Sequence, residues 1–202
     1  ERLLDAPHTF AHVLKVSSYA VVLGGALLDN ARLFDEVRNL AVRDPLTGLS
    51  NYRHLLDVLE REVQRSLRTG RPFAVLLLDL DGLKTINDRY GHLVGSRALC
   101  RLANILRVHC RAMDTAARYG GDEFAVVLPE TTREAAEQVA QRICKRLAAD
   151  VELPVVSVSM GTAVFPQDGD TIEKLLSAAD RALYRMKGRS AVLSFSRLAV
   201  CL

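Results

Sequence analysis

Phe73-Ala74-Val75-Leu76-Leu77-Leu78-Asp79 is a run of six apolar residues that ends in an acid. Continuous apolar runs of this length, introduced by breakers such as Gly70-Arg71-Pro72, are typical of a central strand buried on both faces. The stretch therefore predicts such a strand, with the Asp79 carboxylate at its carboxyl end.

Helical and strand patterns alternate outward from this strand. Apolar residues recur at helical spacing in four segments, at residues 52–68, 97–108, 133–149 and 171–186. Strands are predicted at 155–164, at 191–195, where a last strand would close the sheet, and at 117–128, where Gly120-Gly121 suits a hairpin between two short strands. The alternation predicts an α/β (α+β) domain of the ferredoxin-like, palm type, with a mixed sheet flanked by helices.

A long helix is predicted before this domain, at about 8–43, because the segment lacks proline. Spacings of four and three residues alternate along it, as in the seam of a short coiled coil, at Tyr19, Leu23, Ala26, Asn30, Leu33, Val37 and Leu40. Asn30 would occupy an a position, where a polar residue costs stability but fixes register. A helix that packs on an upstream domain explains the pattern as well, so both roles stay open.

The turn residues Asp44-Pro45-Leu46-Thr47-Gly48 end that helix, since proline disfavours helical backbone in the residue before it. We therefore divide the chain into an N-terminal helix, 1–43, and a globular domain, 44–202. With 202 residues, 49% of them hydrophobic, the chain can bury one full core and carry one appended element.

Charge, cysteine use and hydropathy narrow the class of protein. The net charge of +3 comes from dispersed basic residues, so no nucleic-acid partner is predicted. Four widely spaced cysteines without a Cys-x-x-Cys pair indicate reduced thiols in the cytoplasm. The longest apolar run, 19–28, is shorter than the roughly 20 residues of a spanning helix, and Glu1-Arg2-Leu3-Leu4-Asp5 does not resemble a signal peptide. We expect no membrane segment within this stretch of chain.

Two acidic clusters carry the predicted chemistry: Asp79 with Asp81 at the strand end, and Asp122 with Glu123 at the hairpin. Carboxylates beside an apolar strand are costly unless a positive charge compensates them. A hard cation such as Mg²⁺, held by one or two carboxylates and phosphate oxygens, would supply that charge. Taken alone, either cluster is explained equally well by solvated loop acids.

Three separate motifs resemble the GGDEF family of dinucleotide cyclases, in the family's order and across residues 44 to about 195. They are the opening Asp44-Pro45-Leu46-Thr47-Gly48, the segment Asp79-Leu80-Asp81-Gly82-Leu83-Lys84 with its continuation to His92, and Arg118-Tyr119-Gly120-Gly121-Asp122-Glu123-Phe124. The resemblance implies a homodimer in which two domains face each other, each holding one nucleoside triphosphate. Each 3′-hydroxyl then attacks the partner's α-phosphate, so that two GTP give cyclic di-GMP and two pyrophosphates.

Site roles follow from the resemblance residue by residue. Asp79, the Leu80 carbonyl and Glu123 would hold Mg²⁺, for which Mn²⁺ can substitute, and Asp122 would contact metal and help to deprotonate the attacking hydroxyl. Lys84 would assist catalysis as a positive charge near the phosphates. Further phosphate contacts are implied for Gly120, Gly121, Lys187 and Arg189. Here the family reads Lys-x-x-Gly-Arg-Asn, whereas Lys187-Gly188-Arg189-Ser190 is two residues shorter, so favourable cations at a helix end explain Lys187 and Arg189 equally well.

Base contacts are implied for Asn87, His92 and Ser96. The family norm at Ser96 is aspartate, an acceptor that pairs with the two donors of guanine and disfavours adenine. A serine hydroxyl donates or accepts, and a serine-bearing subgroup of the family also makes cyclic GMP-AMP from GTP and ATP. Relaxed selectivity at Ser96 and a guanine preference preserved by Asn87 alone both stay open.

The resemblance also implies feedback by the cyclic dinucleotide product. Arg111 and Asp114 lie at the spacing of the family's inhibitory motif, and Arg142 matches a secondary arginine of such sites. The stretch at 20–34 resembles the last helix of a GAF sensor domain. The alternative function is a catalytically inactive GGDEF module that binds GTP or cyclic dinucleotide as a receptor, although such modules usually lose the acids that this chain keeps.

Overall fold

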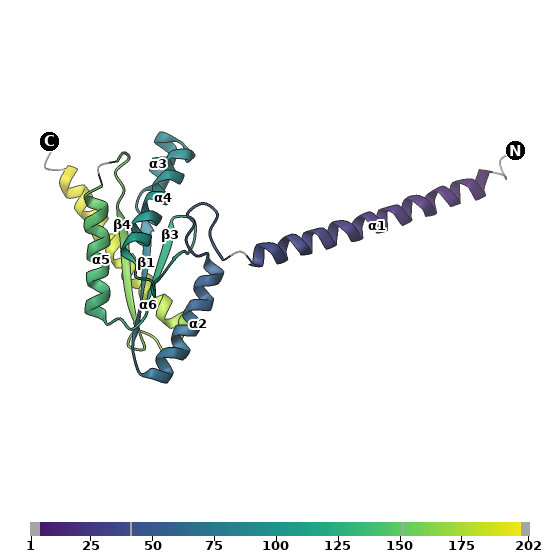
Figure 1. Cartoon of the computed structure of the whole chain (residues 1–202). Helices are drawn as coiled ribbons and strands as arrows, with labels where there is room; N and C mark the ends of the chain where they lie inside the picture. The colour runs from purple at the N-terminus through teal and green to yellow at the C-terminus, as the bar shows by residue number, and fades with distance from the viewer. Residues whose placement is uncertain (1–4, 41, 151, 199–202) are drawn as a thin grey trace. The chain divides into compact units, whose positions relative to one another are not determined.

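The structure, a computed structural model, describes the backbone of residues 5–40, 42–150 and 152–198 (Figure 1). Side chains are described over these ranges except at 5–9, 13, 31–40 and 188–198. The chain divides into two units, Glu1–Ala41 and Val42–Leu202. The first contains helix α1 (Asp5–Leu40), and the second contains the sheet and the other described helices.

The second unit is built on a four-stranded sheet in the order β2-β3-β1-β4. Its strands are β1 (Phe73–Leu80), β2 (Thr115–Arg118), β3 (Glu123–Leu128) and β4 (Val158–Phe165). The three ladders that join these strands are antiparallel, and a single parallel bridge between Ser50 and Ala117 adds to the β2 edge. The central position of β1 explains why all eight of its residues are buried.

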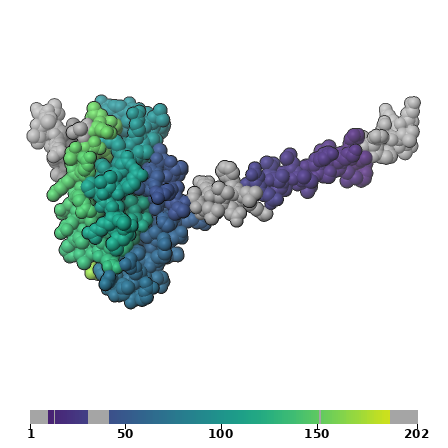
Figure 2. All heavy atoms as spheres, viewed as in Figure 1, coloured from purple at the N-terminus to yellow at the C-terminus, as the bar shows by residue number. Residues whose placement is uncertain are grey.

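Five helices cover the two faces of this sheet (Figure 1). One face carries α2 (Tyr52–Thr69) and α6 (Ile172–Leu198), and the other carries α3 (Leu83–Tyr90), α4 (His92–His109) and α5 (Arg133–Ala148). The space-filling view of Figure 2 shows the green atoms of α5 beside the teal atoms of α4. Because side chains alternate along a strand, β1 contributes Val75 and Leu77 to the first core layer and Leu76 and Leu78 to the second.

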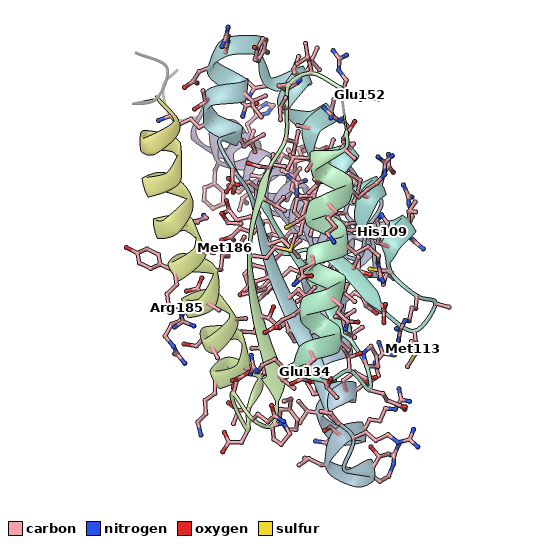
Figure 3. All side chains as sticks on the ribbon, turned by 90° about the vertical axis from the view of Figure 1, so that its left-hand side faces the viewer. His109, Met113, Glu134, Glu152, Arg185 and Met186 are labelled. Atoms are coloured by element: carbon pink, nitrogen blue, oxygen red, sulfur yellow. The ribbon has the colours of Figure 1, made fainter. Side chains whose placement is uncertain are left out.

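Helix α6 packs unusually close to β4 at Gly161. A Cβ atom at this glycine would lie 2.0 Å from the Ala179 carbonyl oxygen, so no larger residue fits without moving the helix. Farther along α6, the Met160 N–H donates to Met186 Sδ at 3.2 Å. Figure 3 shows Met186 on the strand side of α6, while Arg185 extends away from the sheet. This packing holds the part of α6 that leads up to Lys187 against the sheet.

The predicted fold class is confirmed, and each helix and strand predicted between 52 and 186 has a counterpart. The predicted strand at Ala191–Phe195 is wrong, because these residues continue helix α6. A short apolar run fits a strand or a buried helix equally well. Gly188 is tolerated within the helix, and no proline stops it before Leu198.

Helix α1 exposes large apolar side chains, including Leu14, Tyr19, Leu23 and Leu28. Within it, Phe10–Asn30 spans 21 residues with a mean hydropathy of 1.5 and is long and apolar enough to cross a membrane. The sequence analysis considered only the longest uninterrupted apolar run and therefore missed this segment. The mean hydropathy stays high although the segment contains Lys15 and Asp29. Core helices of soluble proteins meet the same criterion, so length and composition alone do not assign α1 to a bilayer.

Candidate functional site

Asp79 and Glu123 face each other across neighbouring strands at one end of the sheet. The Leu80 N–H donates to the Asp122 carbonyl oxygen at 3.0 Å, which holds the turn before β3 against the end of β1. From α6, Lys187 Nζ approaches Asp79 Oδ2 to 2.7 Å. The sheet and α6 therefore bring two carboxylates and one ammonium group together.

The surroundings of these two acids disfavour their ionised form. Burial, together with the charge of Asp122, raises the pKa of Asp79, although Lys187 opposes the rise. Burial raises the pKa of Glu123 as well, and the charges of Asp79 and Asp122 add to the effect. Burial opposes the charge of Lys187, but its contact with Asp79 outweighs this and raises its pKa above the usual value.

A divalent cation fits the Asp79 and Glu123 pair. Mg²⁺ commonly takes one or two protein carboxylates and completes its shell with phosphate oxygens and water. Among the side chains that the structure describes, no group of three or more His, Cys, Asp or Glu is arranged to hold a metal ion. A site at these two acids would thus depend on the Leu80 carbonyl and on oxygens from a phosphate ligand.

Asp81, two residues from Asp79, has hydrogen-bond partners of its own. Its carboxylate accepts hydrogen bonds from Ser157 Oγ and Ser159 Oγ, both at 2.8 Å. Its N–H also donates to the Ser157 carbonyl oxygen at 3.0 Å. The sequence grouped Asp81 with Asp79, whereas the structure gives it contacts that join β1 to β4.

A pocket of about 560 Å³ lies on the α3 and α4 side of the hairpin. It collects six residues to which the sequence analysis gave site roles: Lys84, Asn87, His92, Ser96, Gly121 and Asp122. It also contains six residues to which the sequence analysis gave no individual role in the site: Leu46, Leu83, Asp88, Gly95, Leu99 and Arg118. A pocket of this size accommodates a small molecule such as a nucleotide.

Helix α3 presents its N-terminus at this pocket. Its N-cap is Gly82, with φ +70° and no side-chain capping bond, and Leu83 and Lys84 form its first turn. Uncapped N–H groups and the helix dipole favour an anion at such an end. The polar base candidates Asn87 and Ser96 are half-buried, whereas Lys84 and His92 are exposed.

The glycine turn is held by an arginine whose structural role the sequence analysis missed. Arg118 Nη2 donates to the Gly121 carbonyl oxygen at 2.7 Å, and Arg118 Nε is 3.2 Å from the Gly120 carbonyl oxygen. The same guanidinium pairs with Asp44 Oδ2 at 3.2 Å. Arg118 and Asp44 belong to two of the motifs quoted above, but their contact becomes visible only in the fold.

Arg111 and Asp114 lie apart from the nucleotide-sized pocket. They line a smaller one of about 260 Å³, together with Arg43, Arg107 and Cys110 among others. Asp114 Oδ2 accepts the Arg111 N–H at 2.7 Å, which closes the turn between them. Arg142 is not among the residues that line this pocket.

Arg142 donates to the His109 carbonyl oxygen at 3.0 Å, at the end of α4. Figure 3 shows His109 at this end and Met113 in the loop that leads on to β2. The remaining predicted site residue, Arg189, lies on the backbone of α6, but its side chain is outside the described residues.

Comparison with known proteins agrees with these motifs. The family model described as "Diguanylate cyclase, GGDEF domain" matches residues 41–191. The chain is 39% identical over 171 residues to the bifunctional diguanylate cyclase/cyclic di-GMP phosphodiesterase MucR of Pseudomonas aeruginosa, covering 82% of this chain and 25% of MucR. It is 38% identical over 168 residues to the response regulator PleD of Caulobacter vibrioides, covering 79% of this chain and 37% of PleD.

Solved structures share the fold. A sensory box/GGDEF family protein from Caulobacter crescentus has a TM-score of 0.69 at 38% identity, covering 74% of this chain and 99% of that chain. The GGDEF domain of DgcB from Caulobacter crescentus, in complex with c-di-GMP, has a TM-score of 0.69 at 28% identity, covering 73% and 90%. Because the family model matches residues 41–191, which is most of the chain, this chain belongs to the GGDEF family of diguanylate cyclase domains, which are nucleotidyltransferase-type enzymes.

Proposed function

We propose that the chain condenses two purine nucleoside triphosphates into a cyclic dinucleotide, in the first instance two GTP into cyclic di-GMP and two pyrophosphates. The observation that carries the proposal is a pocket that gathers Lys84, Asn87, Ser96 and Asp122, where Asp122 directly precedes Glu123, the residue opposite Asp79 on the neighbouring strand. The proposal covers this domain, and the chain spans only 25% and 37% of the length of the two relatives named above.

In the proposed reaction, the 3′-hydroxyl oxygen of one nucleotide forms a bond to the α-phosphorus of the other. The bond from that phosphorus to the pyrophosphate oxygen breaks, and pyrophosphate leaves. Asp122 accepts the hydroxyl proton, because its side chain lines the pocket next to the glycine turn. The reaction occurs twice to close the ring.

Phosphate binding is assigned to four features around the turn. The uncapped N-terminus of α3 supplies N–H groups, and Lys84 adds a positive charge in its first turn. Gly120 and Gly121 let the main chain approach a phosphate without side-chain interference. Lys187, which forms an ion pair with Asp79, lies within the same cluster of charges.

Mg²⁺ is the proposed metal, bound by Asp79, Glu123 and the Leu80 carbonyl, with Asp122 close by. When bound, it would stabilise the entering and leaving oxygens of the displacement. The raised pKa values of Asp79 and Glu123 support this assignment, since burial and the neighbouring carboxylates disfavour the charged form of both acids and a cation would offset both effects.

Dimerisation is proposed because each pocket holds one nucleotide and the reaction needs two. Helix α1 supplies a seam for a second copy, in which Tyr19, Leu23 and Asn30 are exposed. Linking two domains through such a seam raises the effective concentration of one half-site near the other. In a longer protein, the same helix would connect a GAF-like sensor to the catalytic domain.

Relaxed base selectivity is proposed on the position of Ser96. Ser96 lines the pocket together with Asn87, which supports a contact between its hydroxyl and a base edge. Because a hydroxyl both donates and accepts, it suits guanine and adenine. We therefore propose cyclic GMP-AMP as a second product when ATP is present.

Product feedback is proposed at the small pocket of Arg111 and Asp114. Arg43 and Arg107 line the same pocket, so three guanidinium groups are available to the phosphates of a cyclic dinucleotide. Arg142 would join the site only by leaving the His109 carbonyl or by acting from another copy of the chain.

The deciding experiment incubates the purified protein with Mg²⁺ and equal concentrations of GTP and ATP, followed by mass spectrometry of the products. Cyclic di-GMP supports the core proposal, and an additional cyclic GMP-AMP peak supports relaxed selectivity. Cyclic di-GMP alone would contradict the role given to Ser96. A dimer that binds GTP but forms no cyclic product would overturn the enzymatic proposal in favour of a receptor.

A further inference from the structure

Gly95 is a buried residue of α4 that contacts the side chain of Asn87 on α3. A Cβ atom built on Gly95 would lie 1.9 Å from Asn87 Oδ1 and 3.0 Å from Asn87 Cγ. The next nearest atom, Leu83 Cδ1, is 3.2 Å away. The amide of Asn87 therefore occupies the space that any other residue at position 95 would need.

The main chains on both sides of this contact are held by hydrogen bonds. The Gly91 N–H donates to the Asn87 carbonyl oxygen at 2.8 Å, and the Gly95 N–H donates to the Gly91 carbonyl oxygen at 3.3 Å. Gly91 is both the C-cap of α3 and the N-cap of α4. Both helices are thus tied to Gly91, and rotation of the Asn87 side chain is the smallest movement that makes room for an added methyl group.

This situation differs from that of the two glycines that are packed against backbone, whereas Gly120 resembles Gly95 in that its nearest obstacle is a side-chain atom, Glu123 Oε2, at 2.8 Å. At Gly161 and Gly169 the nearest obstacles are backbone atoms, so a larger residue would disturb the fold itself. At Gly95 the obstacle is the far end of a side chain that can rotate. Substitution there should preserve the fold while changing where one amide lies.

We propose that Gly95 is a positioning residue for base recognition, because its missing side chain leaves the space that the Asn87 amide occupies in the nucleotide pocket. The inference rests on the proposed function, in which Asn87 contacts the base. Gly95 itself lines the same pocket, between Asn87 and Ser96. The place of the Asn87 amide thus depends on a residue that has no side chain of its own.

The test uses three variants, G95A, N87A and N87A/G95A, with G25A as the matched control. Gly25 is also a helical glycine, in α1, but a Cβ there would meet no atom within 4 Å. Binding of a non-hydrolysable GTP analogue and of its ATP counterpart is measured by calorimetry, with thermal melting as the check on folding. The side-chain NH₂ resonance of Asn87 is followed by NMR without nucleotide.

We expect G95A to weaken GTP-analogue binding about tenfold, the scale of one lost side-chain hydrogen bond, and to weaken ATP-analogue binding less. The Asn87 resonance should move in G95A and stay in place in G25A. In the N87A background the collision is gone, so adding G95A should change the affinity for the GTP analogue less than twofold. Any fall in melting temperature that G95A causes in the wild-type background should be absent when it is added to N87A.

Two results would overturn the inference. One is a full further loss of GTP-analogue affinity when G95A is added to N87A, because the two residues would then act independently. The other is an unmoved Asn87 resonance in folded G95A, a readout that needs no nucleotide. If the wild-type protein fails to bind the GTP analogue while the Asn87 resonance still moves, the positioning holds and the proposed function fails instead.

Discussion

Lys187 Nζ lies 2.7 Å from Asp79 Oδ2, so an ammonium group is paired with the carboxylate that we propose as a metal ligand. Asp79 is 10% exposed at its side chain and Lys187 is 44% exposed, so the lysine can leave toward solvent more easily than the acid. Metal binding and the Lys187 contact therefore compete for Asp79. A lysine released in this way would be free to meet a phosphate.

Replacing Lys187 by methionine should strengthen binding of Mn²⁺ to the nucleotide-free protein by several-fold, because a partly exposed ion pair contributes about 1 kcal/mol or less. Mn²⁺ affinity can be measured by electron paramagnetic resonance. The same variant should bind GTP more weakly, since a phosphate contact is lost. Equal Mn²⁺ affinity in K187M and wild type would show that Lys187 does not compete with the metal for Asp79.

Asp122→Ala should lower turnover by about 10²–10⁴-fold, the usual contribution of a general base. The variant should still fold and bind GTP, because Asp122 lines the pocket without supporting the core. Single-turnover assays with Mg²⁺ present separate the chemical step from binding. D170A, at an exposed acid that pairs with Lys174 four residues on, is the control and should keep full activity. Near-normal turnover in D122A would refute its proposed role.

Ser96→Asp should shift the product mixture from GTP and ATP toward cyclic di-GMP. An aspartate accepts both donors of guanine and repels the ring-nitrogen lone pair of adenine. The ratio of cyclic di-GMP to cyclic GMP-AMP, read by mass spectrometry, reports the change. S96A serves as the comparison, because it removes the hydroxyl without adding charge. An unchanged ratio in S96D would mean that Ser96 does not select the base.

Asp44→Asn should destabilise the domain by about 1–2 kcal/mol at pH 7, since hydrogen bonds to a charged group are lost. Burial opposes the charge of Asp44, but bonds from Thr47 and the charge of Arg118 outweigh it and lower its pKa below 3.8. A carboxylate with a lowered pKa stabilises the fold above its unfolded pKa and loses that effect as pH falls through the folded value. The difference in free energy of unfolding between wild type and D44N should therefore be constant from pH 7 to about 4 and become smaller below pH 4.

Urea unfolding at several pH values measures this gap. D57N, at an exposed position of α2, should show little effect at any pH. A gap that persists unchanged at pH 2 would assign the stability of Asp44 to packing instead of charge.

Local patterns predicted most of the fold because they are imposed by burial and by turn chemistry. The apolar run at 73–79 had to be central, since only a strand covered on both faces buries every residue. The glycine pair at 120–121 fitted a hairpin for the same local reason. The helix at 191–195 was missed because its short apolar run lacks a period that separates strand from helix.

The site was predicted less completely, since several of its contacts join residues far apart in sequence. Asp79 and Asp81 look equivalent along the chain, but they lie in different surroundings once Ser157 and Ser159 take up Asp81. The pairing of Arg118 with Asp44 spans 74 positions. The dependence of Asn87 on Gly95 is invisible without knowing how α3 meets α4.

The start of the domain is hydrogen-bonded directly to the edge of the sheet that carries the glycine turn. The Ser50 N–H donates to the Ala116 carbonyl oxygen at 3.1 Å, and the Arg118 N–H donates to the Ser50 carbonyl oxygen at 2.8 Å. A pull or twist applied at the beginning of this unit would reach the catalytic turn through a few hydrogen bonds, without compressing the core. In mechanical terms, the opening of the domain and the glycine turn share one hydrogen-bonded joint, so we expect a change of angle at Ser50 to be transmitted to that turn.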